Sequence, residues 1–276
     1  MVQLIQILGL PFLACIIIGA ILGYLGIHVL KREVIFIDIA LAQIAAVGSI
    51  AAHLAFEVHG DSLTGYACSL ACVLLAAAFY ALVRRRVIKI SLEAVIGISY
   101  AIAAAGALFL VGIAPGGHLH VQTMLSGSLL WSTWWDVITG LALFSAVGVA
   151  FFIFRKPFKR IADDYDNAIA EGMSVVRWDF LFYALLGVVI TLAVRMAGVV
   201  AVFAFLIIPA TISALLRPNG PGRIFITWLA SIVASLIGLL FAYYLDFSLG
   251  PCVVVFLGGL LIIVSLISKY LQRGIT

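Results

Sequence analysis

Nine apolar runs, each long enough to cross a membrane, set the fold that this chain can adopt. A transmembrane helix needs about 20 mainly apolar residues. The runs cover approximately residues 5–30, 34–55, 63–83, 93–113, 135–154, 179–195, 198–216, 224–245 and 252–268. The pattern predicts an all-α bundle of about eight or nine membrane-spanning helices, in one transmembrane domain over residues 1–276. Only a tight turn near Met196-Ala197-Gly198 separates the sixth run from the seventh.

The composition excludes a water-soluble protein. Hydrophobic residues make up 65% of the chain and charged residues 10%, whereas soluble domains have about 45–50% and about 25%. Lipid is therefore the expected solvent and partner. The first apolar run is too long for a cleaved signal peptide, so we expect it to be retained as a span. The net charge of +4 is explained by the placement of the basic loops, and no nucleic-acid partner is expected.

The basic residues orient the predicted spans, because cytoplasmic loops of membrane proteins carry an excess of Lys and Arg. With the amino terminus outside and the carboxyl terminus cytoplasmic, only Arg195 falls on the outer side. The clusters that then face the cytoplasm are Lys31-Arg32, Arg84-Arg85-Arg86, Arg155 to Arg160, Arg217 with Arg223, and Lys269 with Arg273. We therefore expect a multi-pass membrane protein whose basic loops lie in the cytoplasm.

Histidines gather in the loops predicted to face outward. His53 and His59 lie at the loop after the second run, and His118 and His120 follow the fourth run. Glu57 and Asp61 accompany them, and imidazole with carboxylate is a ligand set that suits zinc. The four histidines are therefore candidate metal ligands on the outer face. The alternative is that they are ordinary polar loop residues.

Asp38 is the one carboxylate that the predicted spans place inside a run and away from a loop. An ionised Asp at the centre of a span costs about 2.5–3.5 kcal/mol on insertion scales. Such a residue usually faces a transport pathway or pairs with an opposite charge. Asp38 is therefore a candidate metal ligand, and the alternative is an Asp near the membrane surface that pairs with a cytoplasmic Arg or Lys.

The longest predicted cytoplasmic loop, at about residues 155–178, has a composition of its own. Acidic residues follow the basic patch, and a short amphipathic helix that ends at Gly172 is expected there. A helix in this position could dock a cytoplasmic partner. A solvated loop helix without a partner is the alternative.

Several motifs, taken in order along the chain, are similar to those of one family. They are Gly23 to Arg32, Phe36 to Gly48, Glu93 to Ile98, Leu125 to Leu130, Ala197 to Ala210 and Tyr243 to Gly250. With these motifs the chain resembles the permease subunits of ABC importers for manganese, zinc and iron. The resemblance implies a permease of the type II importer fold, with Ala168, Ala170, Glu171 and Gly172 at the position of the helix that docks the ATPase.

The second span departs from the family pattern. The family has an Asp and a His there that are thought to serve the metal pathway, and the corresponding residues here are Ile39 and Gln43. Asp38 lies one position earlier, about 100° round a helix. Either the site is rebuilt around Asp38 or the metal is handled elsewhere.

The resemblance implies a transport subunit and not an enzyme. The chain has no P-loop motif, so ATP is expected on a separate cytoplasmic ABC ATPase, and this chain is expected to bind no cofactor of its own. The other implied partners are an extracytoplasmic metal-binding protein and a second permease, identical or related. The transported ion is expected to be a divalent transition metal, and the histidines favour zinc over manganese or iron. The alternative function is an ion-coupled secondary metal transporter.

Overall fold

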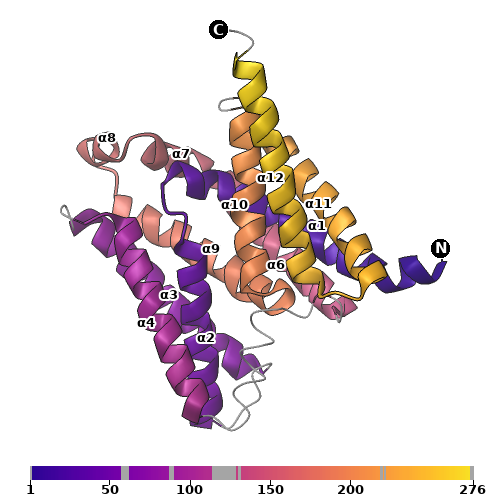
Figure 1. Ribbon diagram of the computed structural model, residues 1–276. Coiled ribbons are helices and arrows are strands. Elements are labelled where there is room, and N and C mark those ends of the chain that lie inside the picture. Colours follow the sequence, from indigo (N-terminus) through magenta and orange to yellow (C-terminus); the bar gives the residue numbers. More distant parts are fainter. Residues whose placement is uncertain are drawn as a thin grey trace. The chain divides into compact units, whose positions relative to one another are not determined.

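A computed structural model describes residues 2–56, 62–86, 90–113, 129, 132–217, 220 and 222–273 of the chain (Figure 1). Within these residues the regular structure is helical and contains no strand. The helices are α1 (Val2–Lys31), α2 (Ile37–Phe56), α3 (Leu63–Arg86), α4 (Leu92–Ile113), α6 (Trp134–Ile153), α7 (Arg155–Asp163), α8 (Tyr165–Ala170), α9 (Val175–Ala197), α10 (Val199–Leu216), α11 (Arg223–Leu245) and α12 (Leu249–Arg273).

The expected bundle of membrane-spanning helices is confirmed. Among the described residues, nine helices are long and apolar enough to cross a membrane. The tight turn between the sixth and seventh spans is present, because Gly198 alone separates α9 from α10 and has a φ of +83°. Glycine adopts this left-handed conformation without the steric cost that a side chain would add. The sixth span begins at Val175, four positions earlier than expected, which places Asp179 inside the helix.

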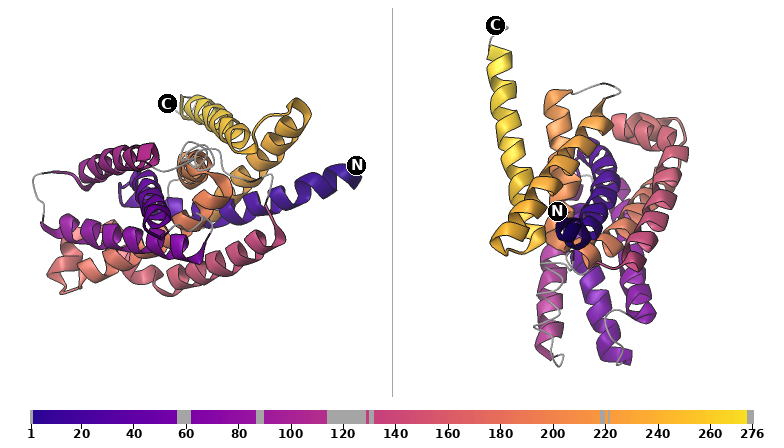
Figure 2. Two further views of the ribbon diagram at one scale, coloured as in Figure 1. Left: turned by 90° about the horizontal axis from the view of Figure 1, so that it is seen from below. Right: turned by 90° about the vertical axis from the view of Figure 1, so that its right-hand side faces the viewer.

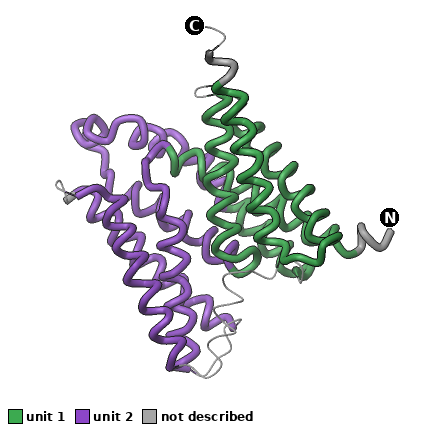
Figure 3. Tube along the Cα trace, viewed as in Figure 1, with its two compact units in different colours: residues 1–30, 126–146, 195–276 green, residues 31–125, 147–194 purple. Residues whose placement is uncertain are grey.

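The chain forms two compact units (Figure 3). Unit 1 contains residues 1–30, 126–146 and 195–276, and unit 2 contains residues 31–125 and 147–194. The single transmembrane domain expected over residues 1–276 stays a prediction.

Unit 1 depends on glycines that let α1 approach its neighbours closely. A Cβ at Gly23 would lie 2.5 Å from Cγ2 of Thr227 in α11. A Cβ at Gly26 would lie 1.8 Å from the backbone oxygen of Leu206 in α10. Small residues at such positions favour helix association in membranes, where close backbone packing replaces the hydrophobic effect. The α1 glycines therefore set the distance between α1 and the pair α10–α11.

Unit 2 is built around α2, which packs against both α3 and α4 (Figure 2). Gly48 of α2 allows the contact with α3, since a Cβ there would lie 2.8 Å from the Cα of Ser69. Gly187 of α9 has the same role, because its Cβ would lie 2.3 Å from Cγ1 of Val73 in α3. The first turns of α2, α4 and α9 lie at the same end of unit 2 as the last turn of α3.

Replacing Gly26 with Ala is expected to destabilise the protein. The added methyl group overlaps a backbone atom that cannot rotate away, and overpacking of this kind costs about 1–3 kcal/mol. The temperature of thermal unfolding of the purified protein in detergent should therefore fall. Gly258→Ala in α12 is the matched control, because a Cβ there meets nothing within 4 Å. Equal unfolding temperatures for the two variants would contradict this account of the packing.

Candidate functional site

A buried ion cluster joins three segments of unit 2. Asp179, in the second turn of α9, accepts a hydrogen bond from Nη1 of Arg32 at 2.5 Å and from Nη1 of Arg84 at 3.2 Å, both on Oδ1. Arg32 lies in the connection between α1 and α2, and Arg84 lies near the end of α3. The side chains of Arg32 and Asp179 are both fully buried. We call Arg32, Arg84 and Asp179 the Asp179 cluster.

Aromatic rings from α7, α8 and α9 cover the two guanidinium groups. The Arg32 guanidinium lies 3.9 Å from the ring centre of Phe182 and 5.8 Å from that of Phe158. The Arg84 guanidinium lies 4.4 Å from the ring centre of Tyr165. Stacking of a cation on an aromatic face stabilises it by about 2 kcal/mol or more when the pair is desolvated. Because Phe158 belongs to α7 and Tyr165 to α8, the cluster holds both short helices against the ends of α3 and α9.

The Asp179 cluster carries two positive charges and one negative charge. Burial lowers the pKa of Arg32, while the adjacent Asp179 carboxylate opposes that effect and stabilises the charged guanidinium. Burial, assisted by the charge of Asp179, raises the pKa of Tyr165 to about 12, so its hydroxyl is neutral at ordinary pH. Removing one member of a buried ion pair leaves an uncompensated charge, which is the costly change. Loss of the Asp179 carboxylate would therefore destabilise the arrangement.

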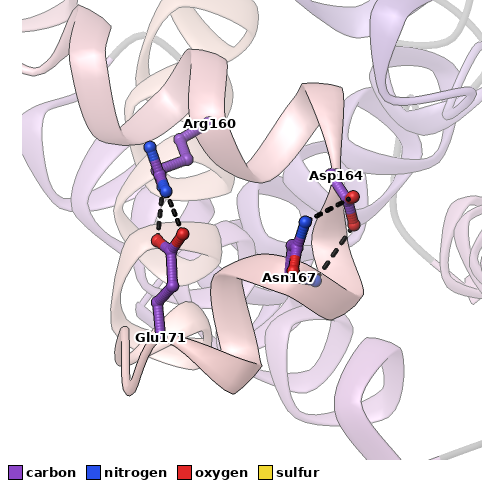
Figure 4. Close-up of polar contacts among 4 residues, drawn as sticks. All are labelled: Arg160, Asp164, Asn167 and Glu171. Atoms are coloured by element: carbon purple, nitrogen blue, oxygen red, sulfur yellow. Dashed lines mark hydrogen bonds and ion pairs between the residues drawn. The ribbon is translucent and has the colours of Figure 1, made fainter.

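The segment α7–α8, residues Arg155–Ala170, ends in a tightly bonded turn (Figure 4). The side chain of Asp164 caps α8 by accepting a hydrogen bond from the backbone N–H of Asn167 at 3.0 Å. Arg160 and Glu171 form a two-pronged ion pair that closes the turn. Gly172 has a φ of +78° and its N–H donates to the oxygen of Ile169 at 2.9 Å. The predicted short helix that ends near Gly172 is therefore confirmed.

The predicted docking residues of this segment divide between the core and the surface. Ala168 is fully buried and packs with Ile161 and Val175. Ala170, Glu171 and Gly172 are exposed. Ala168 therefore anchors the turn from beneath, while the other three form the surface that a partner could reach. Their role in docking stays a prediction.

Asp38 is the second residue of α2 and lies at the end of the span rather than in its middle. Its side chain is 2% exposed, and neither carboxylate oxygen has a hydrogen-bond partner within the part of the chain that the structure describes. Arg32 and Arg84 both pair with Asp179, and the pairing of Asp38 with a cytoplasmic Arg or Lys stays a prediction. Sequence analysis missed Asp179 because it stood at the expected boundary of a span.

Glu93, in the first turn of α4, reaches the beginning of α2. Its Oε1 accepts a hydrogen bond from the backbone N–H of Phe36 at 3.0 Å, and its Oε2 is buried without a partner among the described residues. The two carboxylates of Asp38 and Glu93 act on each other electrostatically. We call Asp38 and Glu93 the acidic pair.

His53, the one predicted histidine ligand that the structure describes, is too far from Asp38 to share an ion with it. His53 lies in the last turn of α2. Residues 38 and 53 are 15 positions apart, which at about 1.5 Å per residue is about 22 Å along the helix. His59, His118 and His120 lie outside the described residues, as do Glu57 and Asp61. In the described part of the chain, no three side chains of His, Cys, Asp or Glu meet in a metal-binding group.

Replacing Asp179 with Asn is expected to cost about 3–5 kcal/mol of stability, because the buried Arg32 and the partly buried Arg84 lose their counter-charge. The measurement is thermal unfolding of the purified protein in detergent. Asp163→Asn is the matched control, since Asp163 pairs with Lys31 at the surface, where ion pairs contribute about 0–1 kcal/mol. An Asp179→Asn protein as stable as the control would show that the Asp179 cluster does not hold unit 2 together.

The comparisons with known proteins point to transport. The YfeC membrane protein of the chelated iron transport system of Yersinia pestis is 24% identical to this chain, over 86% of this chain and 78% of its own length. The MntB membrane protein of the manganese transport system of Synechocystis is 28% identical, over 62% of this chain and 56% of its own length. The chain spans just over half the length of four further curated relatives, at 51–58%.

The fold is similar to that of a solved transporter, PsaBC from Streptococcus pneumoniae in complex with a Fab. The TM-score is 0.81 at 21% identity, and the match covers 99% of this chain and 98% of that chain. The profile of the ABC 3 transport family matches residues 5–268. The resemblance to metal ABC-importer permeases is thereby confirmed: the chain is a multi-pass inner-membrane protein that belongs to the ABC 3 transport family.

Proposed function

We propose that this chain is the membrane-spanning permease of an importer for divalent transition-metal ions, and that a separate cytoplasmic ATPase drives it. The α7–α8 segment is the observation that carries the proposal. It presents an exposed turn at Ala170, Glu171 and Gly172, and it is attached through Phe158 and Tyr165 to the Asp179 cluster. A push on that turn would therefore reach the ends of α3 and α9.

The proposed path of force has three steps. The ATPase contacts the exposed turn, whose shape is fixed by the Arg160–Glu171 ion pair. Ala168 transmits the contact to Ile161 and Val175, with which it packs. Tyr165 and the Asp179 cluster would then transmit the movement of the turn to α3 and α9. Because the cluster is buried and bonded, its members would move together rather than absorb the motion.

The proposed orientation places the amino terminus outside and the carboxyl terminus in the cytoplasm, so that the α7–α8 segment faces the ATPase. A metal-binding protein would deliver the ion at the outer face, where His53, His59, His118 and His120 are candidate contacts. A second permease, identical or related, would complete the pathway. Relatives named for iron and manganese transport support a transition metal, and the outer histidines favour zinc.

The proposal predicts that metal uptake requires ATP. The permease should be reconstituted in liposomes with the ATPase and the metal-binding protein of its own organism, and uptake of Zn²⁺, Mn²⁺ and Fe²⁺ measured with ATP inside the compartment that the ATPase faces. Uptake of at least one ion should occur with ATP and stop when the ATPase is omitted. Uptake driven by a proton or sodium gradient without ATP would instead identify an ion-coupled secondary transporter.

A bulky charge on the exposed turn should uncouple the two subunits. Ala170→Arg is expected to abolish the stimulation of ATP hydrolysis by the permease, because Ala170 is exposed on the proposed docking surface. Asp246→Asn is the matched control: Asp246 is an exposed residue at the C-cap of α11, outside the α7–α8 segment, and Asn tolerates its left-handed φ of 57°. Full stimulation by the Ala170→Arg protein would remove this turn from the docking surface.

A further inference from the structure

Asp38 is a buried carboxylate that forms no ion pair with any side chain in the described part of the chain. Its side chain is 2% exposed, and both of its oxygens lack a hydrogen-bond partner among the described residues. Arg32 and Arg84, on neighbouring segments, each pair with Asp179 through Nη1. A buried charge is costly unless it is paired or coordinates a metal ion. Among the described residues no basic side chain pairs with Asp38, which therefore has the chemistry of a metal ligand.

Glu93 supplies a second carboxylate at the beginning of α2. Its Oε1 accepts the N–H of Phe36, two residues before Asp38, and this bond fixes the Glu93 carboxyl group beside the first turn of α2. Glu93 is not needed to cap its own helix, because Oγ of Ser91 accepts the N–H of Ala94 at 3.2 Å. Its buried Oε2 therefore remains open for a ligand.

The amino ends of two helices stabilise the carboxylates of the acidic pair when no metal ion is bound. Asp38 lies in the first turn of α2, and Glu93 lies in the first turn of α4. The amino ends of helices carry partial positive charge, which stabilises nearby carboxylates. This partial charge is smaller than that of a full cation, so the pair still attracts one. The tight packing of α2 on α4 holds both carboxylates in position before the ion arrives.

We propose that Asp38 and Glu93 together bind a divalent metal ion at the end of α2 and α4 where the Asp179 cluster also lies. Carboxylate oxygens and water suit hard divalent ions such as Mn²⁺, whereas sites selective for zinc usually include nitrogen or sulfur ligands. Two side chains leave several coordination positions to water, which permits the exchange that a transported ion requires. The proposal rests on the proposed transport function and adds to it the second ligand and the class of ion.

The test uses the full-length permease in detergent, with Mn²⁺ itself as the probe. Free Mn²⁺ gives a six-line electron paramagnetic resonance signal that weakens as the ion binds. Asp38→Asn and Glu93→Gln should each lower the Mn²⁺ affinity on the order of tenfold or more, because ligand charge tunes the affinity of carboxylate sites over decades. Glu93→Gln keeps an oxygen that can accept the Phe36 N–H, so the local fold should persist. Asp163→Asn removes an exposed carboxylate and should bind Mn²⁺ as the wild type does.

Wild-type protein gives a second readout that does not depend on any variant folding. A carbodiimide should modify Asp38 and Glu93, and Mn²⁺ should protect both when the modified peptides are quantified by mass spectrometry. Absence of protection, or unchanged Mn²⁺ affinity in the folded variants, would overturn the site. ATP-driven uptake that is unchanged in both variants would overturn its role in transport and leave the importer intact. Mn²⁺ binding at this pair without ATP-driven uptake would retain the site and reject the importer.

Discussion

The buried pairing of Asp179 with Arg32 and Arg84 is the interaction on which unit 2 depends. It draws the connection after α1, the end of α3 and the beginning of α9 onto one carboxylate oxygen. In a mostly apolar protein, an arginine or aspartate that loses its partner in such a cluster cannot be solvated by the surrounding lipid. The ion pairs of the cluster are therefore hard to replace. The cluster also orders its own surroundings, since the rings of Phe158, Phe182 and Tyr165 pack on its guanidinium groups.

The two carboxylates at the ends of α2 and α9 differ in what surrounds them. Asp179 has two arginines within hydrogen-bond distance of its Oδ1, and both belong to the same chain. Asp38 is buried to nearly the same degree but has no such partner among the described residues, and the nearby group is another carboxylate, Glu93. One acid thus stabilises the packing of unit 2, while the other has no ion-pair partner among the described residues. Both lie at the end of unit 2 to which the α7–α8 segment is attached.

The spans could be predicted from the sequence because each depends on local composition alone. The turn at Gly198 and the short helix before Gly172 were also predictable, since glycine marks both local conformations. The pairings were not, because they join residues far apart in the chain. Asp179 is 147 positions from Arg32 and 95 from Arg84, and Glu93 is 57 positions from Phe36. Asp38 was found by its charge, but its place in the first turn of α2 required the structure.

The central claim is that this chain couples a divalent metal ion to ATP hydrolysis on another subunit. The most direct measurement is the ATPase rate of the reconstituted complex, with its metal-binding protein, compared across Zn²⁺, Mn²⁺, Fe²⁺ and no metal. We expect at least one ion to stimulate hydrolysis, and only when this chain is present. An ATP hydrolysis rate that does not change when any of the three ions is added would contradict the proposed coupling. An ATP hydrolysis rate that is the same with and without this chain would contradict it as well.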